Sequence, residues 1–103
     1  MNNNYLAPIV LFVYNRPYHT RKTIEALQKN NLASESNLYI FADGSKQNAT
    51  KEQIQKVQET RDFIRTVSGF KEVIIEESQK NKGLANSVIY GVTKVINEFG
   101  KVI

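Results

Sequence analysis

The 103-residue sequence contains no cysteine. Disulfide bridges, thiolate zinc sites and cysteine nucleophiles are therefore excluded, because each of them needs a cysteine sulfur. Hydrophobic residues make up 41% of the chain and charged residues 23%, and both values are near the averages for globular proteins. We therefore expect one folded domain that is stabilised by packing alone.

Long hydrophobic runs are also missing. The longest run, from Ile9 to Tyr14, is far shorter than the roughly 18 to 20 residues that span a bilayer. A secretory signal begins with a basic region, whereas this chain begins with the polar, uncharged residues that follow Met1. These features predict a cytoplasmic protein with no membrane span in this segment, and they leave open a peripheral position at the inner face of the membrane.

Two common nucleotide-binding signatures are absent from the sequence. No glycine-rich dinucleotide fingerprint follows the first apolar run, and no G-x-x-x-x-G-K-[ST] motif occurs. NAD binding and P-loop chemistry are therefore not expected. The single histidine, His19, has no assignable acid-base partner, and we interpret it as a surface or capping residue.

The chain carries an excess of positive charge. Its formal net charge is +4 and its pI is about 9.4, which permits an anionic partner such as a phosphate-bearing small molecule. The basic residues are scattered through 16–22, 46–65 and 71–101, where they alternate with acids and glutamines. This alternation is typical of solvated helix faces, so we expect no nucleic-acid partner.

Apolar periodicity predicts three strands that alternate with three helices. Short apolar runs are typical of strands buried on both faces, and apolar residues three to four positions apart indicate helices. The strands are predicted over residues 8–14, 38–42 and 73–75, and the helices over residues 17–29, 51–67 and 84–99. Pro17 at a first helical position, a capping box from Thr50 to Gln53, and Gly100 after the last helix support these boundaries.

This order of elements predicts an α/β fold. Parallel strands need crossover connections, which are right-handed and usually helical, so β-α-β-α-β-α indicates a Rossmann-like, three-layer α/β/α arrangement around a parallel sheet. Val102 and Ile103 are apolar and follow a helix stop, so residues 101–103 predict the opening of a fourth strand. We therefore expect residues 1–103 to be the N-terminal part of a larger domain.

Three short motifs follow the predicted strands. Tyr14-Asn-Arg-Pro17 follows the first strand, Asp43-Gly-Ser45 follows the second, and Asn81-Lys-Gly-Leu-Ala-Asn86 opens the last helix. Each motif alone also fits a plain turn or helix start. Their shared place favours a ligand site, because parallel sheets bind ligands beyond the carboxyl ends of their strands.

The side chains in these motifs suit a nucleotide. The ring of Tyr14 can stack on a base, and Asp43 can accept a hydrogen bond from a base N–H or a ribose hydroxyl. Lys82 and the amides that open the last helix can hold a diphosphate by charge and dipole together. Arg16 is a second candidate for a phosphate contact.

The segments Pro8-Ile-Val-Leu-Phe-Val-Tyr-Asn-Arg-Pro17, Phe41-Ala-Asp-Gly-Ser45 and Asn81-Lys-Gly-Leu-Ala-Asn86 resemble those of the family 2 glycosyltransferases and their GT-A relatives. Order and spacing agree over nearly the whole chain. The resemblance implies that Tyr14 and Asp43 hold the base of a nucleotide diphosphate sugar and that the Asn-x-Gly segment lies near the diphosphate. The residues expected to bind the nucleotide sugar are Tyr14, Asn15, Arg16, Asp43, Gly44, Ser45, Asn81, Lys82, Gly83 and Asn86.

The resemblance implies an enzyme of polysaccharide biosynthesis, which transfers the sugar to a glycan or lipid-linked acceptor. Such enzymes hold Mg²⁺ or Mn²⁺ through D-x-D-type acids after the fourth strand, beyond residue 103, so we expect this segment alone to be inactive. Ala42 departs from the family, since many relatives carry a second acid before the position of Asp43. The alternative is a non-catalytic, flavodoxin-like module that binds a nucleotide or a protein.

One expectation concerns the isolated chain. If residues 101–103 open a central strand, the sheet has an unpaired edge and the apolar stripe of the last helix is only partly covered. Such edges and patches bind partners. We therefore expect self-association of the 103-residue chain.

Overall fold

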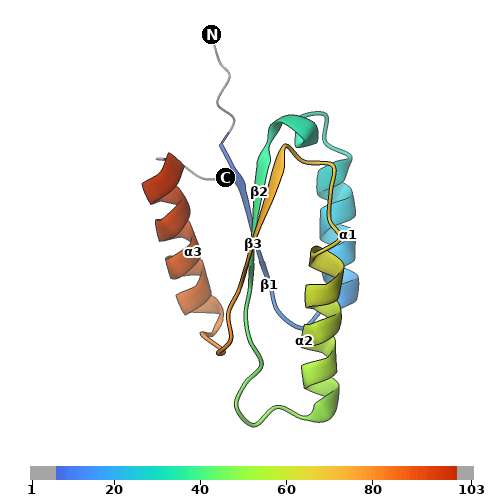
Figure 1. Cartoon of the computed structure of the whole chain (residues 1–103), viewed down its shortest axis with the longest axis vertical. Helices are drawn as coiled ribbons and strands as arrows, with labels where there is room; N and C mark the ends of the chain where they lie inside the picture. The colour runs from blue at the N-terminus through green and yellow to red at the C-terminus, as the bar shows by residue number, and fades with distance from the viewer. Residues whose placement is uncertain (1–6, 100–103) are drawn as a thin grey trace.

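The computed structural model describes residues 7–99 and shows an α/β fold with a parallel sheet in the order β1-β2-β3 (Figure 1). Its elements are β1 (Ile9–Val13), α1 (Pro17–Gln28), the 3₁₀ turn η1 (Ala33–Glu35), β2 (Asn37–Ala42), α2 (Lys51–Ile64), β3 (Glu72–Glu77) and α3 (Leu84–Phe99). The expected fold class and all six expected strands and helices are confirmed. The strand expected from residue 101 lies outside the described residues.

Two elements, β3 and α2, end two or more residues away from the position expected from the sequence, and the other boundaries agree within one residue. β3 is longer than residues 73–75, because the polar residues at its ends still pair in register with the backbone of β2. α2 ends at Ile64 rather than at residue 67. The N–H groups of residues 66 and 67 bond to carbonyls three residues back, which is the tightening typical of a helix end.

The helices α1 and α2 cover one face of the sheet (Figure 1). Ile24 of α1 and Ile64 of α2 are fully buried and pack in one cluster with Leu38 and Ile40, which are alternate residues of β2. Alternate strand residues point to the same face, so every second residue of β2 belongs to this layer. The capping box expected at Thr50 is present and fixes the start of α2.

Within residues 7–99, the opposite face of the sheet is covered by α3 alone (Figure 1). Tyr39 and Phe41 of β2 pack there with Val95, and the Tyr39 hydroxyl donates a hydrogen bond of 2.8 Å to Glu98. At Gly91 the helix lies so close to the sheet that an added Cβ would be 2.7 Å from a ring carbon of Phe12. The three helices and the sheet thus form the three layers expected from the sequence.

The buried stripe of α3 is rotated from the one that the apolar residues predict. Ser87, Gly91 and Val95 are buried at intervals of four residues, whereas Leu84 is 73% exposed and Ile96 is 42% exposed. Small side chains at Ser87 and Gly91 let the helix approach the aromatic residues of the sheet. Larger apolar residues are therefore left partly in solvent, as Ile89 and Ile96 are.

The face on which α3 lies indicates where a following strand would join the sheet. Within residues 7–99, β1 pairs only with β2. Crossovers between parallel strands are right-handed, so the face on which a helix lies determines the direction in which the next strand is added. Helices on the face of α1 add strands in the direction from β1 to β3. A helix on the other face adds the next strand in the opposite direction, on the far side of β1. A parallel strand that followed α3 would consequently pair with β1.

We expect Gly91→Ala to lower the free energy of unfolding. Overpacking costs about 1 to 3 kcal/mol and opposes the helix-propensity gain of about 1 kcal/mol. The new methyl group would meet Phe12 and Phe41 at 3.0 Å or less, so the cost should prevail. Urea denaturation followed by circular dichroism measures the change, with Thr93→Ala at an exposed position of α3 as the control. A Gly91→Ala variant as stable as the control would contradict the close approach.

Candidate functional site

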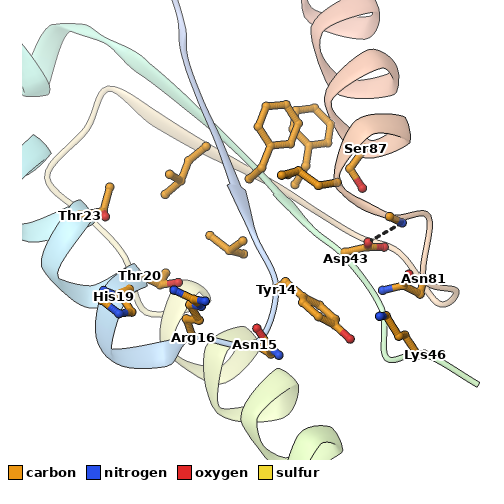
Figure 2. A pocket seen from close by; sticks show the side chains of 16 residues that line it. Tyr14, Asn15, Arg16, His19, Thr20, Thr23, Asp43, Lys46, Asn81 and Ser87 are labelled. Atoms are coloured by element: carbon orange, nitrogen blue, oxygen red, sulfur yellow. Dashed lines mark hydrogen bonds between the residues drawn. The ribbon is translucent and has the colours of Figure 1, made fainter. Parts of the chain in front are cut away.

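A pocket of about 580 Å³ opens where β1 and β2 end and α3 begins (Figure 2). This volume lies within the range of small-molecule sites. Apolar residues of the sheet, Leu11, Phe12 and Phe41, form part of its wall. Polar side chains from α1 and from the loops after β1, β2 and β3 complete it. The pocket therefore lies at the sheet edge that the sequence motifs predict.

Six of the ten sequence-predicted residues line this pocket. They are Tyr14, Asn15, Arg16, Asp43, Asn81 and Gly83. Tyr14 and Asn15 follow β1, and Arg16 is the N-cap residue of α1 (Figure 2). The three motifs thus converge in space although they are up to 69 positions apart in the sequence, from residue 14 to residue 83.

The other four predicted residues, Gly44, Ser45, Lys82 and Asn86, are not among those that line the pocket. The ammonium group of Lys82 lies 3.6 Å from the centre of the Tyr90 ring, and Lys82 borders a separate, small hollow between β3 and α3. A cation held over a ring face is stabilised by the ring quadrupole. The side chain of Asn86 donates a hydrogen bond of 2.9 Å to the carbonyl of Lys82.

The sequence analysis missed two ionisable residues of the pocket. Lys46 follows the Asp-Gly-Ser turn directly, and its side chain lies beside Asn81 and Tyr14 (Figure 2). Its position one residue beyond a predicted motif could have indicated that Lys46 lines the pocket. His19 is exposed, as expected, but it also lines the pocket from the first turn of α1. Its position one helical turn after residue 15 could have indicated this.

Asp43 is buried at the centre of the loop contacts. Its Oδ1 accepts hydrogen bonds of 2.9 Å from the backbone N–H groups of Gly44 and Lys82, and its Oδ2 accepts one of 3.0 Å from that of Gly83. The side chain of Asn81 donates a further bond of 2.9 Å to the carbonyl of Gly44. Three of these four hydrogen bonds, those made by Asn81, Lys82 and Gly83, join the loop after β2 to the loop before α3.

The two glycines in these loops have different roles. At Gly44 an added Cβ would be 2.7 Å from the carbonyl oxygen of Ser78 and 2.9 Å from Gln79, so the backbone after β3 leaves no room for a side chain. At Gly83 the backbone has φ +81°, in the left-handed region that glycine adopts at least cost. Gly44 is thus required because no side chain fits there, and Gly83 is required because of its backbone conformation.

An ion-pair network supports the site from the side of α2. Arg61 donates hydrogen bonds to the main-chain carbonyls of Asp43 and Ser78, the former at 3.2 Å. Its guanidinium group also lies 3.6 Å from Glu77, which accepts a bidentate pair from Arg65 at 2.6 and 2.8 Å. The hydrogen bonds from Arg65 lower the pKa of Glu77.

A second network supports the site from the side of α3. Glu76 accepts hydrogen bonds from the Tyr90 hydroxyl and, at 2.8 Å, from the ammonium group of Lys94. Burial disfavours the charged form of Glu76, but these two hydrogen bonds outweigh burial and lower its pKa. The neighbouring acids Glu76 and Glu77 of β3 therefore anchor helices on opposite faces of the sheet.

The charges that line the pocket favour an anion. Arg16 and Lys46 contribute cationic groups. Among the described residues that line the pocket the one carboxylate is that of Asp43, and it is already bonded to backbone amides. The start of α3, a helix of 16 residues, lies beside the pocket at Leu84. Helix N-termini carry partial positive charge, which adds to that of the side chains.

Residues 7–99 contain neither a cluster of metal ligands nor a membrane-spanning helix. No group of three or more histidine or acidic side chains in this range could hold a metal ion. No helix in the same range has both the length and the apolar character that crossing a membrane requires. The acids expected to hold Mg²⁺ or Mn²⁺ would lie beyond residue 103, outside the described residues.

We expect the Glu77 pair to contribute stability that depends on pH. A carboxyl group whose pKa is lowered by folding stabilises the protein above its unfolded pKa, and this contribution is lost as the pH falls through the folded pKa, below the ordinary 4.5. Between pH 7 and pH 3, the free energy of unfolding of wild type should therefore fall by about 0.5 to 1 kcal/mol more than that of Glu77→Gln. This range is typical of exposed ion pairs. Urea midpoints measure this, with Glu25→Gln on the exposed face of α1 as the control. Equal losses in wild type and Glu77→Gln would contradict a stabilising pair.

Comparison of the chain with protein-family models, with curated proteins and with solved structures found no significant match. The resemblance to family 2 glycosyltransferases therefore rests on the three motifs and on their convergence at one pocket.

Proposed function

We propose that the chain binds the nucleotide diphosphate of a nucleotide sugar, as the donor-binding part of a glycosyltransferase. The parent enzyme would transfer the sugar to a glycan or lipid-linked acceptor, in the cytoplasm or at the inner face of the membrane. One observation carries the proposal. Three motifs that are far apart in the sequence line one pocket at the carboxyl ends of parallel strands, where α/β sheets bind nucleotides.

Tyr14 is the candidate base contact. It follows β1 directly, and its ring lies beside the pocket between the ends of β1 and β2 (Figure 2). The neighbouring wall of Leu11 and Phe12 is apolar. An aromatic ring beside an apolar wall suits the stacking of a flat base, which needs a π-face more than particular hydrogen bonds.

Arg16 and Lys46 are the candidate phosphate contacts. They reach the pocket from different loops, and the start of α3 lies on its third side. A diphosphate presents several anionic oxygens, so it can use charges that come from separate directions. Lys82, which the sequence analysis assigned to the diphosphate, is held over Tyr90 instead, so Lys46 takes its place in the proposal.

Binding measurements on point variants test this assignment. We expect Arg16→Ala and Lys46→Ala each to weaken the binding of uridine and guanosine diphosphates by about tenfold, near the lower end of the range for hydrogen bonds to charged groups. Lys22→Ala, on an exposed part of α1 outside the pocket lining, is the matched control. Isothermal titration calorimetry would measure each affinity.

The same panel separates the proposed function from its alternatives. The matching nucleosides, which lack phosphate, should bind more weakly than the diphosphates. Their affinities for Arg16→Ala and for wild type should be equal. A chain that binds none of the diphosphates or nucleotide sugars would overturn the proposal. Tight binding of a nucleotide with no gain from its attached sugar would favour the flavodoxin-like module.

We also propose that the isolated chain self-associates. β1 has no charged residue and, among the described residues, pairs on one side only. Ile89 and Ile96 on α3 are 64% and 42% exposed. Apolar edges and patches of this kind favour association. Light scattering at about 50 µM, a concentration at which weak association is detectable, should show dimers or larger species, and Ile89→Lys should reduce them. A monomer under these conditions would rule this out.

A further inference from the structure

The carboxylate of Asp43 is engaged by the protein itself. Three backbone N–H groups donate to it at 2.9 to 3.0 Å, and two of them come from residues 39 and 40 positions away. A carboxylate offers about four acceptor positions, so at least three are filled before any ligand binds. Asp43 is also only 8% exposed.

These bonds are energetically necessary at a buried position. A charged group that is removed from water is costly unless hydrogen bonds replace those it made with water. The amides of Lys82 and Gly83 supply that replacement, and the carboxylate in turn satisfies two N–H groups at the start of a helix. A ligand that displaced these amides from the carboxylate would leave them without their partner.

The segment that Asp43 holds forms one side of the pocket. Asn81 and Gly83 line the pocket, and α3 begins directly after them. The main chain of Asp43 is fixed from the other direction, because Arg61 of α2 donates to its carbonyl. One residue at the end of β2 therefore connects α2, on one face of the sheet, to the start of α3 on the other.

We propose that Asp43 is a positioning residue. Its carboxylate holds residues 81–83, and thereby the start of α3, in the position that shapes the pocket. In this view Asp43 affects ligand affinity through that segment and makes no direct contact with the base. The part that concerns affinity rests on the proposed function, whereas the part that concerns the loop does not.

The wild-type chain itself provides the first test. NMR detects couplings across hydrogen bonds, here from the amide nitrogens of Lys82 and Gly83 to the carboxyl carbon of Asp43. We expect both couplings in the ligand-free protein and again with uridine diphosphate bound. Their absence from the free protein, or their loss when the nucleotide binds, would overturn the proposal. This test needs no variant, so it does not depend on whether a variant folds.

Asp43→Asn provides the second test. An asparagine has one acceptor oxygen and an NH₂ group that cannot accept, so it cannot satisfy both Lys82 and Gly83. Hydrogen exchange at these two amides should accelerate about tenfold or more, as when local opening becomes about 1.4 kcal/mol easier. The amide of Ile40 in the buried strand β2 is the internal control and should be unaffected. Unchanged exchange at residues 82 and 83 would contradict the assigned role.

Affinities distinguish positioning from base contact. A displaced segment should weaken the binding of uridine, guanosine and thymidine diphosphates by the same factor. A lost base contact should instead be selective: it should affect uridine and thymidine diphosphates, whose bases share one N–H edge, differently from guanosine diphosphate. Asp43→Asn with an unchanged order of affinities supports the proposal, and a selective loss overturns it. If no nucleotide binds even to wild type, the proposed function fails, and the couplings and exchange rates still decide the role of Asp43.

Discussion

The hydrogen bonds between the Asp43 carboxylate and the amides of Lys82 and Gly83 connect the sheet to α3, the helix on its second face. In the described part of the chain, α3 covers that face by itself and is held there by few large apolar side chains, since its buried stripe contains Ser87 and Gly91. The polar contacts at its start, and the Tyr39 to Glu98 bond near its end, therefore have a large share in fixing its position. The pocket depends on the same contacts, because residues 81–83 are part of its wall.

Much of the fold could be predicted from the sequence, because the evidence for it is local. The apolar run of β2 and the capping box at Thr50 concern residues that are close together in the chain, and the structure confirms both. The exclusion of a side chain at Gly44 could not be predicted, since it arises from Ser78 and Gln79, which reach it only in the folded chain. The rotated packing of α3 was missed for the same reason, because the sequence shows glycine at position 91 but not the ring of Phe12 against it.

The candidate site shows the same limit. The motifs indicated where a ligand site would be, because parallel strands bring their carboxyl ends to one edge regardless of detail. The direction of each side chain depends on its neighbours, so Lys82 lies over Tyr90 while Lys46, outside any predicted motif, reaches the pocket. Sequence reasoning also gave Asp43 a contact with the ligand, because a carboxylate after a strand suits that role. It could not show that amides 39 and 40 residues away already occupy that carboxylate.

The engagement of Asp43 also changes the electrostatics of the pocket. A carboxylate that accepts three N–H groups has much of its negative potential offset by their dipoles, so it repels an incoming anion less than a free carboxylate would. Arg16, Lys46 and the start of α3 then dominate the field in the pocket. An acid in this place is thus compatible with a diphosphate ligand because the protein has already neutralised part of its effect.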